Sequence, residues 1–378
     1  VTYNGSAQSP SWSNYNSSQL TIGGTSSATN AGSYSATFTP TSNYKWSDGT
    51  TTAKSASWTI GKAAGSITLS ASSLSLTYPK TSGTITVTRP GSGTVTASSG
   101  STNIATVSVS GTTITVTAKA TGSATITVNV GADTNYTAPS SKTFTVAVTL
   151  VSKTLSSNSW AVIKAVSDAG QGANYWSVGA TKSVTINGKV GATTISSLKV
   201  DAFIIGFNHN SGKEGSNRIH FLLGKISGKF VGLVDSSYGS TTSTSGAFTM
   251  NTSNTNSGGW GSSQMRSKVL GSASSPTSPT ANTLLAALPS DLRAVMKSCT
   301  KYTDNKGGSN TASNVSSTTD YLFLLSEYEV FATHQYCNDA EPNYQAQYDY
   351  FKAGNSKVAN KHSATGTAAV WWLRSPSY

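Results

Sequence analysis

Residues 64–149 alternate apolar side chains with serine or threonine, and this alternation limits the fold of the chain more than any other feature. Successive side chains of a β-strand point to opposite faces, so a spacing of two places the apolar residues on one face. Turn formers such as Gly91-Ser92-Gly93 and Ser110-Gly111 separate the runs. The pattern predicts at least six half-buried strands, which pack as a two-sheet β sandwich. The apolar positions are Leu74, Leu76, Ile85, Val87, Val107, Val109, Ile114, Val116, Ala124, Ile126, Val128, Phe144, Val146 and Val148.

Residues 1–62 carry shorter alternating runs, separated by turn formers such as Gly23-Gly24 and Asp48-Gly49. Apolar and aromatic residues again recur at a spacing of two, which places them on one face of each strand. We therefore expect a second, smaller β sandwich. The residues that share a face are Tyr34, Ala36 and Phe38 in one strand, and Trp58 and Ile60 in another.

Further aromatic residues of this first segment allow two interpretations. Aromatic faces can stack on sugar rings, so these side chains could form a sugar-binding platform. Alternatively, they form the core of a module that has few other large apolar residues. We favour the core. The residues are Tyr3, Trp12, Tyr15, Tyr44 and Trp46.

After Val151 the pattern changes to a mixture of helices and strands. Residues 156–159 offer several N-cap oxygens, and the apolar residues that follow at helical spacing predict a helix that ends at Gly170. Residues 239–257 are almost wholly Ser, Thr, Gly and Asn, which predicts a long surface loop. Residues 151–378 are thus predicted to be an α+β domain. Its other predicted strands are 183–186, 203–207, 219–223 and 230–234, and its other predicted helices are 260–270, 283–288 and 290–297.

The composition favours a location outside the cell. Only 11% of the 378 residues are charged, while Ser, Thr, Gly and Asn are abundant, as in extracellular β proteins. A chain of this length exceeds a single core, and we expect three domains: 1–62, 63–150 and 151–378. The formal net charge of +12 permits attraction to polyanions. Lysines and arginines form no run and no basic helix, however, so we expect no nucleic-acid partner.

No apolar stretch approaches the roughly 18 residues that span a bilayer, so we expect no membrane insertion. The sequence also shows no signal peptide. It starts at Val1, within what the pattern indicates is a strand, and we expect that an export signal or further modules precede it.

Three segments of residues 1–62 resemble the MBG family of bacterial surface repeats. They are Val1-Thr2-Tyr3-Asn4-Gly5, the NAGSYSATF segment at 30–38, and the YKWSDG segment at 44–49. Residues 103–107 and 121–128 resemble bacterial Ig-like domains of group 2 (BIG2). These resemblances imply immunoglobulin-like β sandwiches that act as spacers in adhesins and in phage tail or capsid proteins.

Residues 151–378 resemble an uncharacterised family of domains from gut Firmicutes and their phages. The most specific segment is Trp371-Trp372-Leu373-Arg374-Ser375-Pro376. In such domains it resembles the central strand of a C-type-lectin-like fold, a scaffold that phage receptor-binding proteins also use. The resemblance implies ligand binding, and it implies that further strands and ligand-facing loops follow Pro376. The other matching segments are 160–170, 174–179, 207–210, 217–221, 288–302 and 324–327.

Five residues are candidate ligand contacts. Asn208, His209 and Asn210 follow a predicted strand, at a place where functional loops often lie. The alternative is a turn in which the asparagine side chains satisfy backbone groups. On a strand, Arg374 would share a face with Trp372 and could form the floor of a ligand surface. Alternatively, these residues hold the domain together.

Other motifs give little support to catalysis or metal binding. The four histidines show no metal-site spacing, so we expect no metal and no cofactor. Glu327 and Glu329 lie two residues apart, as a glycosidase pair on one strand could, but Ser326 predicts a helix start with these acids in its first turn. Cys299 and Cys337 could form a disulfide or could remain separate buried thiols. We expect that the chain is not an enzyme.

These features predict an extracellular receptor-binding or adhesion protein of a phage tail, a virion or a Gram-positive cell surface. An immunoglobulin-like stalk would display a domain that binds a host or cell-surface glycan or protein. The alternative is a purely structural module of a virion decoration or a cell-wall layer, whose partners are other copies or virion and cell-wall components. A carbohydrate-active enzyme is the third possibility.

Overall fold

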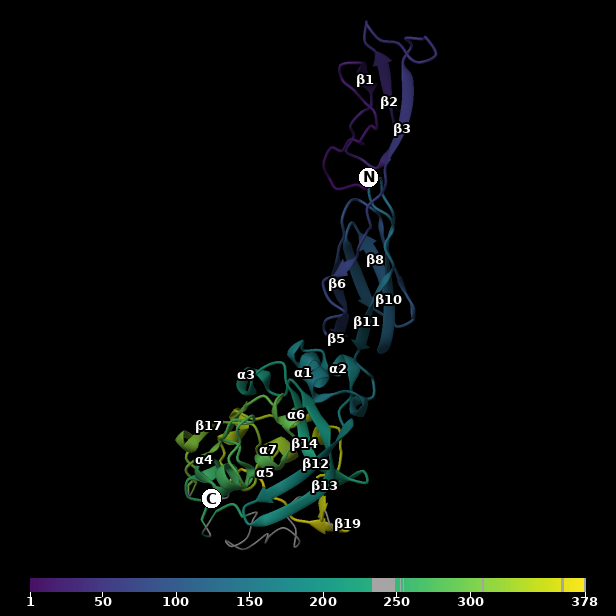
Figure 1. Ribbon diagram of the computed structural model, residues 1–378. Helices are drawn as coiled ribbons and strands as arrows, with labels where there is room; N and C mark the ends of the chain where they lie inside the picture. The colour runs from purple at the N-terminus through teal and green to yellow at the C-terminus, as the bar shows by residue number, and fades with distance from the viewer. Residues whose placement is uncertain (233–248, 252, 254, 308, 362–363, 377–378) are drawn as a thin grey trace. The chain divides into compact units, whose positions relative to one another are not determined.

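The computed structural model of the chain describes residues 1–232, 249–251, 253, 255–307, 309–361 and 364–376 (Figure 1). The chain forms two compact units, Val1–Leu150 and Val151–Tyr378. Strands dominate both units, and the longest helix in the described ranges has nine residues. The protein is therefore a multidomain, mainly β-sheet protein, as its alternating pattern indicates.

Residues 63–150 form the predicted two-sheet sandwich, with four strands in each sheet. The buried apolar side chains of both sheets meet in one core, which includes Leu76, Ile114, Ile126 and Val146. Serine and threonine occupy the alternate positions, so the spacing of two does place the apolar face inward. One sheet has the order β5 (Ser73–Thr77), β11 (Lys142–Thr149), β10 (Gly122–Val130) and β7 (Val95–Ser99). The other has the order β4 (Thr68–Leu69), β6 (Ser82–Thr88), β9 (Thr113–Ala118) and β8 (Ala105–Ser110).

Residues 1–62, all of them described, form a single antiparallel sheet, so the prediction of a second sandwich is wrong. The sheet contains β1 (Leu20–Gly24), β2 (Gly32–Pro40) and β3 (Lys54–Ile60). Residues 1–19 lack alternating aliphatic residues, and they pair only through isolated bridges such as Thr2 with Gly61. The segment therefore cannot supply a second apolar face.

The aromatic residues of this module are less buried than a core would require. Trp12 and Tyr15 lie edge-on against Phe38 and are half-buried, whereas Tyr44 is 44% exposed. The fully buried hydrophobic residues are Ala36, Trp58 and Ile60. The expectation of an aromatic core thus holds in part for Trp12 and Tyr15 and is wrong for Tyr44.

Residues 151–378 contain a six-stranded sheet and a separate hairpin. The strands predicted at 183–186, 203–207 and 219–223 are confirmed; of the strand predicted at 230–234, residues 233 and 234 lie outside the described residues. The sheet order is β12 (Thr181–Val190), β13 (Thr193–Phe207), β14 (Ile219–Ile226), β15 (Lys229–Gly232), β18 (Ala359–Lys361) and β19 (Ala364–Ala369). The hairpin is β16 (Cys299–Asp304) and β17 (Val315–Asp320).

The first predicted helix is confirmed as α1 (Trp160–Asp168). Ser159 caps this helix by accepting a hydrogen bond from the Val162 amide. The helices predicted later in the chain are present but shorter: α4 (Gly259–Ser262) with a π-helical turn at Met265–Leu270, α5 (Leu284–Ala287) and α6 (Ser290–Arg293). The other α-helices of the described residues are α2 (Gly172–Tyr175), α3 (Ser211–Glu214), α7 (Glu327–Phe331) and α8 (Asp349–Lys352). Residues 239–248 of the predicted loop lie outside the described residues, and the described part of 249–257 forms neither helix nor strand.

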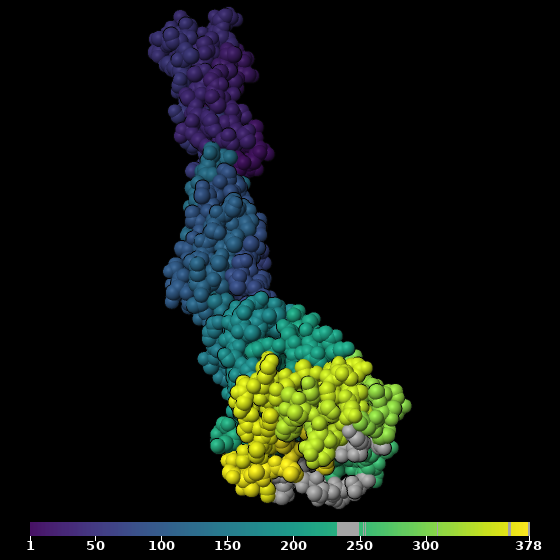
Figure 2. Space-filling model, turned by 180° about the vertical axis from the view of Figure 1, so that it is seen from behind, coloured from purple at the N-terminus to yellow at the C-terminus, as the bar shows by residue number. Residues whose placement is uncertain are grey.

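The predicted strand at 371–376 does not form, because β19 ends at Ala369 and the segment after it is irregular. Side chains hold this segment instead of a strand ladder. Arg374 is buried in an ion pair with Glu329, and Ser375 donates a hydrogen bond to Glu341. In the space-filling view the last part of the chain, in yellow, covers one face of the C-terminal unit (Figure 2).

Within the described part of the chain, no helix is both long and apolar enough to cross a membrane. Cys299 and Cys337 are both buried and unpaired, which is the second of the two alternatives that the sequence leaves open.

Candidate ligand-binding pocket

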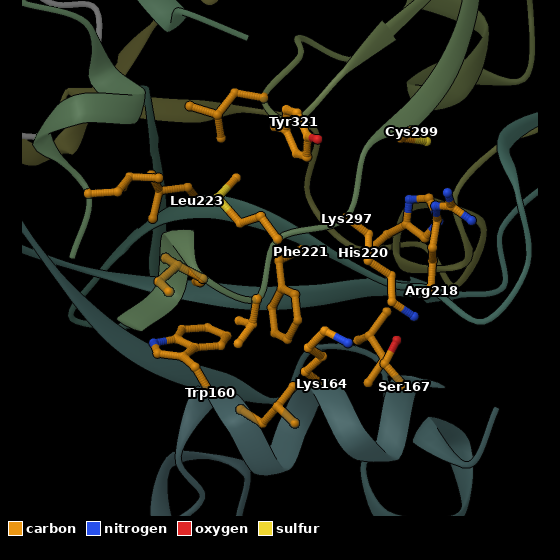
Figure 3. Close-up of a pocket in the computed structure, with 18 of the residues that line it drawn as sticks. Trp160, Lys164, Ser167, Arg218, His220, Phe221, Leu223, Lys297, Cys299 and Tyr321 are labelled. Carbon is orange, nitrogen blue, oxygen red and sulfur yellow. The ribbon is translucent and has the colours of Figure 1, made fainter. Parts of the chain in front are cut away.

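A pocket of about 170 Å³ opens in the C-terminal unit between α1, β14 and the segment from Leu288 to Cys299 (Figure 3). Helix α1 contributes Trp160, Ile163, Lys164 and Ser167, which lie three or four residues apart and therefore share one face. Strand β14 contributes Ile219, Phe221 and Leu223, which lie two apart, and also His220 between them. The apolar lining residues are Trp160, Ile163, Ala202, Ile219, Phe221, Leu223, Leu288, Leu292, Val295, Met296, Leu322 and Phe323.

The walls of the pocket are partly aromatic. The rings of Trp160 and Phe221 meet edge to face, with centroids 5.5 Å apart. Trp160 is buried, whereas Phe221, Leu223 and Met296 remain partly exposed. Partly exposed apolar side chains around a concavity are a common feature of binding sites.

Three basic residues, Lys164, Lys297 and Arg218, also line the pocket. Asp168 forms ion pairs with both lysines, each with an N–O distance of 2.5 Å. Burial opposes ionisation of Asp168, but the hydrogen bonds from the lysines outweigh it and lower the pKa of the carboxyl. Arg218 donates to the backbone oxygens of Ser298 and Ser216. Three positive charges and one negative charge therefore leave this side of the pocket cationic.

His220 lines the same pocket and is 5% exposed. Its Nδ1 lies 3.0 Å from the hydroxyl of Tyr348, and that hydroxyl accepts a hydrogen bond of 2.8 Å from Lys301. The hydroxyl proton is thus left for Nδ1, which places the proton of a neutral imidazole on Nε2. Burial, assisted by the charge of Lys301, lowers the pKa of His220 well below its usual value, so the ring is neutral. Nε2 has no hydrogen-bond partner among the described residues.

A buried ionic network lies behind His220. The Nζ of Lys301 is 2.9 Å from an oxygen of Glu214 and 2.9 Å from an oxygen of Glu329. Arg374 forms a bidentate pair with Glu329, with N–O distances of 2.6 and 2.8 Å. His209 completes the network, because its Nδ1 lies 3.0 Å from Glu214.

The network keeps its charges in a medium that disfavours them. Burial raises the energy of the Glu329 carboxylate, but the positive charges of Arg374 and Lys301 outweigh burial and hold its pKa well below the usual range. Burial also raises the pKa of the Cys299 thiol to about 12, so this thiol stays protonated and unreactive. The charged groups of the network are thus bound to one another.

His209, Glu214 and His220 carry donor atoms within 4.8 Å of one another, a spacing that a metal ion could bridge. The residues do not fit a metal, however. The ammonium of Lys301 already lies 2.9 Å from the same oxygen of Glu214. Both ring nitrogens of His209 already have oxygen partners, Glu214 at 3.0 Å from Nδ1 and the backbone oxygen of Ala346 at 2.9 Å from Nε2.

None of the five predicted ligand residues lines the pocket. Asn208 and Asn210 adopt left-handed backbone conformations; Asn208 accepts from the Arg218 amide, and Asn210 donates to the backbone oxygen of Tyr344. These contacts agree with the alternative of a stabilising turn. His209 and Arg374 are buried in the network, and Trp372 is half-buried with no hydrogen-bond partner at Nε1 among the described residues. As ligand contacts, the five residues stay predictions.

Both acids of the Glu327 and Glu329 pair are used by the fold. Ser326 caps α7, and its side chain and that of Glu329 form a reciprocal capping box, which confirms the predicted helix start. Glu327 accepts hydrogen bonds from the backbone amides of residues 335–337.

Sequence reasoning did not identify His220 as a site residue. In the sequence His220 is only one member of an alternating strand pattern, and the lack of a partner for its Nε2 among the described residues depends on tertiary contacts.

Comparison with solved structures finds domains of the surface-layer protein SbsC. Domains 4 and 5 align at 21% identity and a TM-score of 0.20, covering 31% of this chain and 65% of that one. Domains 1–6 align at 24% identity and a TM-score of 0.21, covering 32% and 16%. Domains 4–9 align at 15% identity and a TM-score of 0.20, covering 46% and 24%. The chain therefore spans less than two thirds of each of these structures, and TM-scores near 0.2 do not establish a common fold.

A search of the curated proteins finds no match to this chain. A family model does match the C-terminal part, which includes the pocket segment from Leu288 to Phe323 but neither α1 nor β14. Residues 242–378 match the family described as "Domain of unknown function (DUF6273)".

Proposed function

We propose that the chain is a ligand-binding protein of a bacterial cell surface or a virion, in which residues 151–378 bind a ligand through the pocket and residues 1–150 act as a spacer. The observation that carries this proposal is the unpartnered Nε2 of His220, which is buried beside an apolar pocket. An unsatisfied buried donor costs roughly 1–3 kcal/mol. A ligand that brings an acceptor to His220 would remove this cost.

The surface location is supported by the composition. The scarcity of charged residues and the serine- and threonine-faced sandwich are typical of extracellular β proteins. The SbsC alignments add nothing to this argument, because their TM-scores lie near 0.2. A C-type-lectin-like scaffold for residues 151–378 stays a proposal; it is supported by the sequence motif at 371–376 but not by a strand there.

The apolar lining narrows the kind of ligand that the pocket can hold. A glycan chain presents mainly hydroxyl groups, whereas most of the residues that line this pocket are apolar. An apolar group of a small molecule, or of a partner protein, fits these walls better than a saccharide. Of the two ligand classes that the sequence analysis expects, a glycan or a protein, we therefore favour a ligand with an apolar group over a glycan.

A purely structural module of a virion or a cell-wall layer is the second candidate. It is favoured by the buried network, in which His209, Glu214, Lys301, Glu329 and Arg374 are all bound to other residues of the unit. Such an interior stabilises a fold but offers no group to a ligand. The two candidates differ in whether the pocket is ever occupied.

Ligand-observed NMR on the full chain, with a library of small ring compounds, short peptides and sugars, would test the proposal. Leu223→Trp and Met296→Trp fill the pocket from two walls, and Val358→Trp is the matched control, because Val358 is 56% exposed and lies outside the pocket. We expect compounds that bind the wild type and Val358→Trp but neither pocket variant, with thermal melting used to check that all variants are folded. If no compound distinguishes the pocket variants from the control, the structural role is favoured instead.

A further inference from the structure

We infer that the pocket binds a single aromatic ring that carries a carboxylate. This inference deepens the proposed function and depends on it. It follows from three features of the pocket: its size, the separation of its apolar and polar sides, and the kind of donors that it offers.

The size fits one ring. Apolar cavities of about 150 Å³ bind benzene in proteins, and this pocket measures about 170 Å³. Trp160 and Phe221 already meet edge to face, which is the geometry that aromatic rings prefer, and Met296 adds a sulfur that packs well against ring edges. A long acyl chain or a disaccharide would exceed this volume.

The lining is divided into two sides. In Figure 3, Trp160 and Leu223 lie on one side of the pocket, and His220, Arg218 and Lys297 lie on the opposite side. A bound molecule therefore meets apolar surface at one end and hydrogen-bond donors at the other. Such a division favours a ligand with one apolar end and one polar end.

The donors at the polar side favour an anion over a neutral group. The protonated Nε2 of His220 can only donate, and so can the side chains of Arg218 and Lys297. Asp168 neutralises one of the lysines at most, so the side keeps a positive excess. Hydrogen bonds from charged donors to a carboxylate are about twice as strong as neutral ones. A carboxylate is the group that accepts from several such donors at once.

Two sources can present this chemistry. One is a free arylcarboxylic acid, and the other is a peptide that ends in phenylalanine, whose ring and terminal carboxylate lie close together. The pocket features are common to both, and the experiment separates them.

Isothermal titration calorimetry on the full chain would use four small probes: 3-phenylpropionate, its neutral amide, toluene and propionate. We expect 3-phenylpropionate to bind at least tenfold more tightly than the amide, and propionate not to bind. The second arm uses acetyl-Gly-Gly-Phe with a free or an amidated C-terminus. Tighter binding of the peptide with the free C-terminus than of 3-phenylpropionate would identify a peptide as the source of the ligand. Tighter binding of 3-phenylpropionate would identify a free arylcarboxylic acid.

Variants locate the bound anion. We expect Lys297→Met to weaken the binding of 3-phenylpropionate roughly tenfold and to leave the binding of toluene unchanged. Lys229 is exposed and lies outside the pocket, so Lys229→Met should change the binding of neither compound. His220→Phe removes the donor but could unfold the unit, so the ¹⁵N resonance of Nε2 in the wild type serves as a second readout and should shift on binding.

The outcomes separate this inference from the proposed function. If toluene or the amide binds as tightly as 3-phenylpropionate, or if only ligands of another class bind the pocket, the carboxylate inference is overturned while the pocket remains a binding site. If neither these probes nor any compound of the library binds, both fall.

Discussion

Arg374 is buried in the interior of the C-terminal unit, where it forms an ion pair with Glu329. It pairs with both oxygens of Glu329 and donates to Thr303 and to the backbone oxygen of Leu324. Removal of one partner of a buried ion pair leaves an uncompensated charge, which costs about 3–5 kcal/mol. We therefore expect Arg374→Met to lower the unfolding free energy of this unit by that amount, measured by chemical denaturation of the full chain.

Lys229→Met is the matched control, because Lys229 is exposed at the start of β15 and joins no buried pair. Its effect should stay within about 0.5 kcal/mol. A loss below about 1 kcal/mol for Arg374→Met would contradict the role assigned to the pair and would mean that Lys301 alone compensates Glu329.

Glu329 gives the C-terminal unit a dependence on pH. Because Arg374 and Lys301 hold the pKa of Glu329 below its ordinary value of 4.5, the folded state keeps this carboxylate ionised when the unfolded state would protonate it. Its contribution to stability is complete above the unfolded pKa and is lost as the pH falls through that value toward the folded pKa. We expect Glu329→Gln to show a shallower loss of stability between about pH 5 and 3 than the wild type.

The measurement is chemical denaturation of both proteins at several pH values across this range. Lys229→Met should keep the slope of the wild type. Equal slopes for the wild type and Glu329→Gln would show that other carboxylates account for the acid sensitivity.

Some residue roles could be predicted from the sequence, and others could not. Ser159 and Ser326 act within their own helix turns, so local pattern was sufficient to predict both caps. Lys301, Glu214 and Arg374 are far apart in the chain, and each looks like an isolated surface charge. Their pairing depends on tertiary contacts that no local spacing encodes.

At the scale of elements, success followed the strength of the periodic pattern. The strands of the sandwich were predictable because each buries one face, which fixes a period of two. The strand predicted at 371–376 was based on resemblance to a family motif and not on a periodic pattern, and it does not form. Side-chain contacts of Arg374 and Ser375 hold this segment instead. The helices after residue 259 are shorter than the sequence pattern predicts, since they form single turns between irregular segments.

The loop at Asp133–Thr137 joins the two β modules of the N-terminal unit. Asn135 accepts from the amide of Ala31 and donates to the side chain of Asn30, and Lys62 donates to the backbone oxygen of Asp133. Hydrogen bonds of this kind contribute about 0.5–1.5 kcal/mol each. We expect Asn135→Ala to loosen the contact around Lys62 and to speed tryptic cleavage after Lys62 several-fold.

The matched control is Asn129→Ala, since Asn129 is an exposed asparagine of β10 within the sandwich. It should leave the cleavage rate at Lys62 unchanged. An unchanged rate in Asn135→Ala as well would show that the backbone pairing of Ala63 with residues 135–137 holds the modules without this side chain.

At the scale of the whole molecule, each compact unit contains a core of its own. The sandwich core includes Leu76 and Val146, and the core of the C-terminal unit includes Phe203, Tyr348 and Phe351. The two cores share no residue, and the boundary between the two units lies between Leu150 and Val151. Units that bury their apolar surface separately are expected to unfold as separate cooperative transitions.

Differential scanning calorimetry of the full chain, with one core variant in each unit, tests this independence. Leu76→Ala removes a fully buried side chain of the sandwich, which costs about 2–5 kcal/mol and should lower one transition by at least about 4 °C. Arg374→Met should lower only the other transition, by at least about 6 °C, because a unit of this size loses about 2–4 °C per kcal/mol. The double variant should show both shifts, each as large as alone, since the sites share no partner. One common transition that both substitutions lower would instead require the units to fold as a single cooperative body.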